Sequence, residues 1–277
     1  MSPAVEEASA PRMSYPAETP PRRRFFRRAN AYEDIRTLLE CAPLKGYCLD
    51  LPAGRGVNLA GIRAAGFRPI CADLFPAKTK SGGSPCLKVD FLGPLPFASE
   101  SLEAILCSEG IEHHSSQTEF LADCARVLKP GGILLITTPN ILSFRARLAY
   151  LFNGQSSFRR KPLSEVTQFW QGKYLGHVHL IDYFRLRFLL WQAGLKVRVV
   201  TTAKYSLISM LLAPLLYLPA WIFTRRVFAR SHRDRPAVAE EICRHVLSLD
   251  LLLGKKLIVV AEKPCSNGPQ PLVPEVR

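Results

Sequence analysis

The stretch YCLDLPAGRGVNLAGIRAAGF, residues 47–67, predicts how the surrounding chain folds. It begins as an apolar strand that ends at Asp50. A small-residue turn with Ala53, Gly54 and Gly56 follows, and an amphipathic helix starts directly after it. Such a turn lets a ligand approach main-chain N–H groups, and the helix adds the positive end of its dipole. The stretch therefore predicts a ligand bound against the backbone of this turn.

Strand and helix patterns alternate along the chain on both sides of this turn. The predicted strands are YCLDL, PICADL, CLKVDF, LEAILCS, ILLITTP, LKVRVV and KKLIVVAEK. The predicted helices cover residues 31–41, 58–65 and 117–128, and KPGG at 129–132 is expected to be a turn. The uninterrupted apolar run LEAILCS is typical of a parallel sheet covered on both faces. This alternation predicts an open α/β sheet.

Composition narrows the class of protein. The chain has 277 residues, of which 48% are hydrophobic, so it is long enough to bury a substantial core. Its eight cysteines form no Cys-x-x-Cys pair, which argues against a zinc or redox motif. Cysteines inside apolar strands predict free thiols and a reducing, cytoplasmic compartment. The N-terminus has no apolar segment behind its charges, so no secretory signal is predicted.

The net charge of +14 is unevenly distributed. Residues 31–140 carry −2, whereas residues 141–235 carry +13, from 16 Lys and Arg against three acids. Such a segment suits an anionic partner: a phosphorylated substrate, a membrane surface or nucleic acid. The alternative is that the segment is a basic face exposed to solvent. Residues 1–29, ending in RRRFFRR, and residues 265–277 are predicted to be disordered tails.

Polar residues follow four of the predicted strands at the point where each strand ends. In an open α/β sheet these ends meet at one edge, where ligands bind. Asp73 is placed to accept both hydroxyls of a ribose, and Asp90 to accept from the amine of an adenine, although either acid alone is more often a helix cap. A dinucleotide site lacks its third glycine here, and a P-loop lacks its Gly-Lys-Ser/Thr. The ligand is therefore predicted to be an adenine nucleoside.

Several blocks resemble class I S-adenosylmethionine-dependent methyltransferases over roughly residues 40–200. They are LDLPAGRG, CADLFP, VDFLGPLPFASESLEAILCSEGIEH, FLADCARVLKPGGILLITTPN and GHVHLIDYFRLRFLLWQAGLKV, and KKLIVVAEK resembles the last strand of that family. The resemblance implies a Rossmann-like α/β fold, a mostly parallel seven-stranded sheet with helices on both faces. It places a methyltransferase domain at 30–200, a hydrophobic and basic insertion at 201–254 and the last strand at 255–264.

The resemblance also implies S-adenosylmethionine as the cofactor. The residues that would bind it are Asp50, Leu51, Ala53, Gly54, Gly56, Asp73, Leu74, Asp90, Phe91, Ser108 and Glu109. One position departs from the family, because Pro52 stands where glycine is usual. Proline fixes φ and removes an N–H. We expect binding to survive with a changed turn, but weak or lost binding stays open.

Methyl transfer from a sulfonium needs mainly alignment of the nucleophile, and a general base only for a poor nucleophile such as a sugar hydroxyl. Two histidine pairs are candidates for the base, His113 with His114 and His177 with His179, and His113 is our choice. The commoner role of such histidines is to cap a turn or to bond a backbone carbonyl.

The block EGIEH, residues 109–113, suggests a metal site. It resembles the Glu-x-x-Glu-His of ubiquinone-pathway O-methyltransferases and small-RNA 2′-O-methyltransferases, which is associated with a divalent metal. The ligands implied for Mg²⁺ or Mn²⁺ are Glu109, Glu112, His113 and His177. Many relatives with this block have no known metal, so a site without metal is an open alternative.

The stretch SLISMLLAPLLYLPAWIF, residues 206–223, carries no charge and is followed by Arg225 and Arg226. Its length is just enough to cross a bilayer, but the strands on either side of it belong to one sheet, which argues against a single crossing. Pro214 and Pro219 are expected to break its helix. It is then an interfacial or re-entrant element, an apolar lid over a lipophilic substrate, or a buried helical pair or dimer interface.

The combined prediction is a cytoplasmic methyltransferase, peripheral on the inner face of the membrane through residues 206–226. Its acceptor is a hydroxyl of a lipid-linked or phosphorylated saccharide or of an isoprenoid-type lipid. One alternative is an RNA methyltransferase that uses residues 141–235, although that segment lacks aromatics interleaved for base stacking. The other is an inactive membrane adaptor that has lost turnover because of Pro52. No oligomeric state is predicted.

Overall fold

The computed structural model describes residues 31–78, 85–157, 169–170, 173–174 and 177–265 of the chain. The predicted tails, 1–29 and 265–277, lie outside the described residues except for Cys265. So does the central part of the basic segment, residues 158–168.

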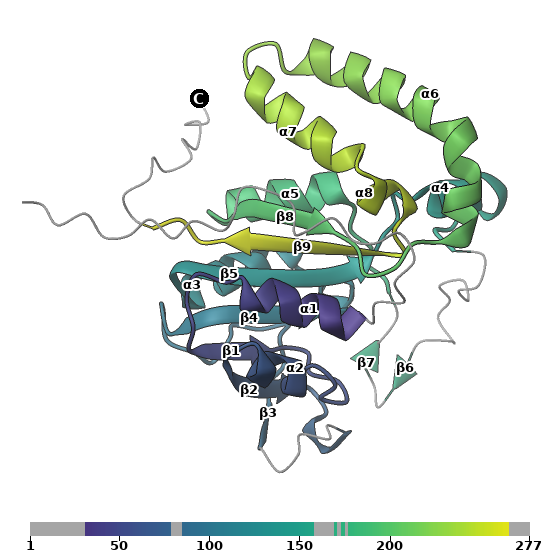
Figure 1. The fold of residues 1–277 in the computed structure, drawn as a ribbon. Coiled ribbons are helices and arrows are strands. Elements are labelled where there is room, and N and C mark those ends of the chain that lie inside the picture. The colour runs from purple at the N-terminus through teal and green to yellow at the C-terminus, as the bar shows by residue number, and fades with distance from the viewer. Residues whose placement is uncertain (1–30, 79–84, 158–168, 171–172, 175–176, 266–277) are drawn as a thin grey trace, which may run out of the picture.

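Seven strands form one sheet in the order β3-β2-β1-β4-β5-β9-β8 (Figure 1). They are β1 (Tyr47–Asp50), β2 (Arg68–Asp73), β3 (Cys86–Lys88), β4 (Leu102–Ser108), β5 (Leu128–Pro139), β8 (Lys196–Thr201) and β9 (Lys256–Glu262). Only β9 runs antiparallel to its neighbours within this sheet. The strand order reverses between β1 and β4, which is the point where such sheets bind ligands. The predicted fold class is confirmed.

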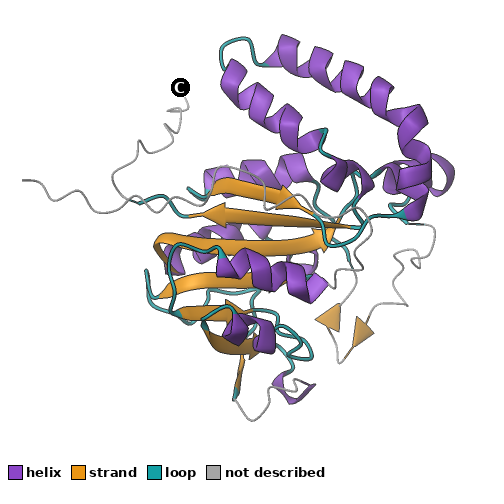
Figure 2. Cartoon of the chain, in the orientation of Figure 1, coloured by secondary structure: helices purple, strands orange, loops and turns teal. Residues whose placement is uncertain are grey.

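Helices cover both faces of the sheet (Figure 2). They are α1 (Ala31–Glu40), α2 (Leu59–Ala64), α3 (Gln117–Val127), α4 (Phe144–Asn153), α5 (Tyr183–Gln192), α6 (Leu207–Ser231), α7 (Pro236–Val246) and α8 (Leu249–Leu253), with short 3-10 helices η1 (Pro76–Lys78) and η2 (Ile111–His113). A separate hairpin pairs β6 (Phe169–Trp170) with β7 (Lys173–Tyr174).

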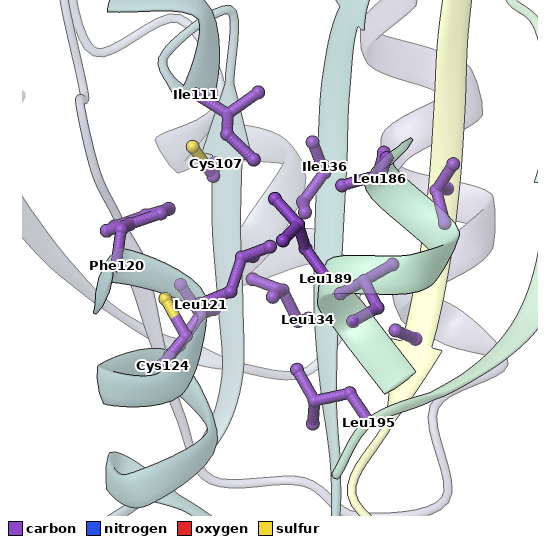
Figure 3. Packing of buried hydrophobic residues seen from close by; sticks show 14 of the residues in the cluster. Cys107, Ile111, Phe120, Leu121, Cys124, Leu134, Ile136, Leu186, Leu189 and Leu195 are labelled. Carbon is purple, nitrogen blue, oxygen red and sulfur yellow. The ribbon is translucent and has the colours of Figure 1, made fainter. Parts of the chain in front are cut away.

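Two apolar cores separate the faces. On one face, leucines of α1 and Ile62 of α2 pack on β1, β4, β5 and β9. On the other face, Phe120, Leu121 and Cys124 of α3 and Leu186 of α5 pack over the same strands (Figure 3). Burial of these side chains stabilises each helix far more than its own propensity does. The core thereby fixes where the strand ends, and hence the site residues, lie.

Two local predictions differ from the structure. Residues 129–132, expected as a turn, lie within β5, which begins at Leu128 and joins β4 with a register shift. The prediction that Pro214 and Pro219 break a helix is wrong, because α6 continues through both. Both rings are exposed, and the neighbouring Ala213, Leu216 and Ala220 pack on a core of Phe144, Leu252 and Leu253, which holds the helix together across both prolines.

The segment between β8 and β9 forms a helical hairpin at the edge of the molecule. In Figure 1, α6 starts beside α4 and runs across the top of the view, α7 returns beneath it, and α8 leads into β9. Phe144, Leu252 and Leu253 form a small core beneath α6. The α6 side chains packed on this core are Met210, Leu212, Ala213, Leu216 and Ala220. The hairpin therefore covers its own base and leaves the outer side of α6 uncovered.

Candidate functional site

A cavity of about 380 Å³ lies at the carboxyl edge of β1 and β4, beside α1 and the start of β9. The residues lining it are Ile35, Pro52, Ala53, Gly54, Arg55, Val57, Asn58, Ser108, Glu109, Thr137, Lys256 and Ile258. Ala53, Gly54, Ser108 and Glu109 are predicted cofactor residues. The other predicted ones, which are Asp50, Leu51, Gly56, Asp73, Leu74, Asp90 and Phe91, are not among the lining residues. The cavity therefore coincides with one part of the predicted site.

The glycine turn is held between two strands by its backbone. Leu51 N donates to Leu106 O (3.0 Å), and Ala53 N donates to Ala72 O (2.9 Å). Gly54 and Gly56 have φ values of 55° and 74°, a conformation that costs glycine little and other residues more. The turn thus has the backbone geometry that the sequence predicts for a ligand-binding loop.

Asp73 fixes this turn from the end of β2. Its Oδ2 accepts from Gly54 N (2.8 Å), and its Oδ1 accepts from Phe75 N (2.7 Å). The sequence suggests Asp73 as a ribose ligand or as a cap for backbone N–H groups, and the structure shows that it does bind backbone N–H groups of the turn. Each carboxylate oxygen keeps a second lone pair for a ligand hydroxyl. One side chain therefore has the means both to shape the turn and to bind a sugar.

Pro52 lines the cavity and packs against a glycine that sequence reasoning missed. The Leu51–Pro52 peptide bond is cis. A Cβ added at Gly110 would lie 2.3 Å from Pro52 Cδ and 3.0 Å from Cys107 Sγ. Position 110 is therefore restricted to glycine while a proline occupies position 52. The unusual proline and Gly110, which follows β4, fit each other as a pair.

Asp50 is fully buried between β2 and β4 at the end of β1. Burial raises the pKa of its carboxyl from 3.8 to about 7. Asn58 Nδ2 donates to Asp50 Oδ1 at 3.4 Å, which lowers the pKa, and the nearby Asp73 charge raises it. Asp50 therefore lies behind the glycine turn as a carboxyl group that titrates near neutral pH.

This pKa makes folding stability depend on pH. Between about pH 4 and pH 7 the folded chain holds a proton on Asp50 that the unfolded chain releases, so Asp50 lowers stability as pH rises. We expect D50N to remove this contribution, which amounts to as much as about 4 kcal/mol. Urea unfolding of wild type and D50N at pH 5 and pH 8 measures it. The stability gained by D50N should be larger at pH 8, and an equal gain at both values would contradict the assignment.

The comparison with D50N is needed because His245 acts in the opposite direction. Burial lowers the pKa of His245 to about 4, so its contribution to stability is lost as pH falls from about 6.5 to 4. Both proteins contain His245, and the difference between them isolates Asp50.

Residues at the ends of β4, β5 and β9 form the floor of the cavity. Ser108 Oγ lies 3.1 Å from Thr137 Oγ1, and Glu109 N donates to Thr137 O (2.9 Å). Lys256 Nζ, at the start of β9, lies 3.6 Å from Glu109 Oε1. Sequence reasoning missed Thr137 and Lys256. The signal for Lys256 was its place at the start of an antiparallel last strand, which puts that end at the carboxyl edge of the others.

The structure brings three of the four predicted metal ligands together. Candidate ligand atoms of Glu112, His113 and His177 all lie within 4.8 Å of one another, and Glu112 is fully buried. Glu112 Oε1 lies 3.4 Å from His177 Nδ1, and Thr138 Oγ1 donates to Glu112 Oε2 (3.1 Å). Glu109 does not belong to this group and faces Lys256 instead.

His114 is a structural histidine. Ser116 N donates to its Nδ1 (3.0 Å), so Nε2 carries the proton and donates to Phe91 O (2.5 Å). Burial lowers its pKa. Phe91 is buried against Phe120, whereas Asp90 is exposed. Of the pair after β4, His114 is thus committed to the core, whereas the ring of His113 lies 4.8 Å, centroid to centroid, from that of His177.

Comparison with known proteins identifies the family. A model of the methyltransferase domain matches residues 22–200. The chain belongs to the methyltransferase domain family, and its class is that of the S-adenosylmethionine-dependent methyltransferases. This confirms the resemblance stated from the sequence. S-Adenosylmethionine is accordingly the cofactor that the family implies.

Individual relatives match over short segments. A probable S-adenosylmethionine-dependent methyltransferase of Mycolicibacterium smegmatis is 40% identical over 53 residues, 19% of this chain and 21% of that one. The ubiquinone biosynthesis O-methyltransferase of Caulobacter vibrioides is 30% identical over 109 residues, 36% of this chain and 43% of that one. The demethylmenaquinone methyltransferase of Tropheryma whipplei is 32% identical over 94 residues, 32% of this chain and 39% of that one. The match thus spans less than half the length of each.

A solved structure with a similar fold is the S-adenosylmethionine-dependent methyltransferase from Archaeoglobus fulgidus. It is 16% identical, with a TM-score of 0.49 over 84% of this chain and 94% of that one.

Proposed function

We propose that the protein transfers a methyl group from S-adenosylmethionine to a hydroxyl of a lipophilic acceptor. The observation that carries the proposal is the cavity at the switch point, walled by Gly54 and floored by Ser108. Asp73, directly behind the turn, supplies acceptors for the ribose hydroxyls, and Glu109 closes the floor.

The acceptor we favour is an isoprenoid-type lipid or a lipid-linked saccharide. Two relatives are named for ubiquinone biosynthesis and demethylmenaquinone methylation, and the insertion at 201–254 exposes many large apolar side chains. We assign His113 as the base, since an unactivated hydroxyl needs one near neutral pH. The cytoplasmic face of a membrane is the compartment that this acceptor implies.

Glu112, His113 and His177 are suited to hold a divalent metal. One buried carboxylate and two imidazoles are a donor set for Mn²⁺, Fe²⁺ or Zn²⁺ rather than for Mg²⁺, which prefers oxygen ligands. When bound, such an ion lowers the pKa of a coordinated hydroxyl. The buried Glu112 keeps the two rings together, and Thr138 holds its carboxylate in place. If a metal binds here, His113 serves as a ligand and another group must act as the base.

Transfer of a labelled methyl group tests the proposal. Labelled S-adenosylmethionine is incubated with the protein and with membrane, soluble and RNA fractions of a cell extract. We expect label in the lipids of the membrane fraction, and none when D73A replaces the wild type. Label in RNA would instead support nucleic-acid methylation through the basic segment. Cofactor binding without transfer to any fraction would support the inactive adaptor.

A further inference from the structure

The outer side of α6 carries a continuous apolar stripe. Leu207, Leu211, Leu215 and Leu218 follow helical spacing and are 69%, 73%, 72% and 62% exposed. The inner side, by contrast, packs on the small core around Phe144. Soluble proteins rarely leave such a stripe uncovered, since exposing leucine side chains to water is unfavourable.

The ends of α6 are fixed to the sheet domain. Near its start, Arg145 N of α4 donates to Ser209 Oγ (3.0 Å). Near its end, Phe228 stacks on Phe184 of α5, with ring centroids 6.0 Å apart. A helix attached at both ends lies along its domain and does not project away from it.

The topology also argues against a transmembrane α6. Within the described part of the chain, one helix, α6, has the length and the apolar composition needed to cross a bilayer. However, β8 before it and β9 after it pair with each other in one sheet. The return path, α7, has only 11 residues and carries Glu240, Glu241 and Arg244. A crossing by α6 would leave α7 too short and too charged to return.

Cationic and amphipathic residues follow the stripe. Arg225, Arg226 and Arg230 are exposed in the last two turns of α6. Arg225 forms a salt bridge with Glu240 of α7, with 2.7 Å between nitrogen and oxygen. Trp221, 42% exposed, lies one turn before these arginines. A stripe of leucines followed by tryptophan and arginine is typical of helices that lie in the headgroup layer of anionic membranes.

The stripe begins at the edge of the sheet where the cavity lies. Both α4 and α6 follow strands, β5 and β8, that run in the same direction, since both are antiparallel to β9. Their first residues therefore lie at the carboxyl edge. Leu151 and Phe152 of α4 are 76% and 72% exposed, and α4 contacts α6. The leucine stripe thus starts at the edge of the site, on a helix that contacts α4 and its two exposed apolar side chains.

We infer that α6 docks lengthwise on an anionic lipid bilayer, with its leucine stripe and Leu151 and Phe152 in the interface. The arginines at its end contact the lipid headgroups. This orientation places the carboxyl edge of the sheet next to the membrane, where a lipid acceptor is within reach. Docking needs neither acceptor nor turnover, so it stands or fails separately from the proposed methyl transfer.

Vesicle flotation of the full chain tests the inference. The probes are phosphatidylcholine vesicles with and without 30% phosphatidylglycerol, a composition chosen for roughly physiological surface charge. We expect wild type to float with the anionic vesicles and L211Q/L215Q to bind them at least tenfold more weakly. R226Q/R230Q should lose the preference for anionic lipid while keeping weak binding to neutral vesicles. The double variant L87Q/V238Q, which changes exposed residues on β3 and α7, is the matched control.

Three outcomes overturn the inference. The first is wild type that binds neither vesicle. The second is equal binding by wild type and L211Q/L215Q, with folding of both verified by circular dichroism. The third is a dimer in analytical ultracentrifugation that L211Q/L215Q converts to a monomer, because the stripe would then be covered by a second copy of the chain.

Discussion

D73A is expected to weaken binding of S-adenosylmethionine at least a hundredfold. The variant loses the acceptors for Gly54 N and Phe75 N together with the group assigned to the ribose hydroxyls. Hydrogen bonds to a charged group contribute about 1.5–3 kcal/mol each, so loss of the turn anchor and one ribose contact accounts for the effect. Isothermal titration calorimetry of both proteins measures it.

Asp182 offers a matched control for this prediction. Its side chain also accepts from two backbone N–H groups, Phe184 N (2.7 Å) and Arg185 N (3.0 Å), but it caps α5 and does not line the cavity. D182A should lose about 1 kcal/mol of stability and keep its cofactor affinity within about twofold. Equal losses of affinity in D73A and D182A would show that Asp73 acts only through general stability.

G110A is expected to have the second large effect. The added methyl would lie 2.3 Å from Pro52 Cδ, so the proline and the turn behind it must move. Overpacking of this kind costs about 1–3 kcal/mol of folding free energy. Because Pro52 lines the cavity, we expect cofactor affinity to fall more than tenfold. Thermal unfolding and calorimetric titration measure the two effects.

The double variant P52G/G110A separates this contact from a general effect of the substitution. Removing the proline ring removes the atoms that the new methyl meets first, and Cys107 Sγ at 3.0 Å remains as a smaller obstacle. Most of the affinity lost in G110A should therefore return. Additive losses from P52G and G110A would contradict the pairing of these two positions.

The sequence predicts the sheet, the glycine turn and the acids at the strand ends because these features are local. Strand ends in a parallel sheet meet at one edge, so the placement of Asp73 and Ser108 follows once the strands are recognised. The pairing of Glu109 with Lys256 and of Pro52 with Gly110 joins distant segments, and no local pattern reveals it. Long-range packing also decides that α6 stays continuous through Pro214 and Pro219.

The two histidines after β4 also show that a local sequence pattern does not decide the role of a residue. The sequence offers both His113 and His114 as candidate bases and we chose His113, but only the hydrogen bonds to Phe91 and Ser116 show that His114 belongs to the core. The contact between His177 and Glu112 is implied by the family resemblance alone, since the two residues lie far apart in the sequence.

The central claim is that the cavity at the carboxyl edge of β1 and β4 binds S-adenosylmethionine. Titration of this cofactor into the purified wild-type chain tests the claim most directly. We predict saturable heat with one molecule bound per chain, displaced by S-adenosylhomocysteine. No heat, together with no shift in melting temperature at millimolar cofactor, would contradict a functional cofactor site.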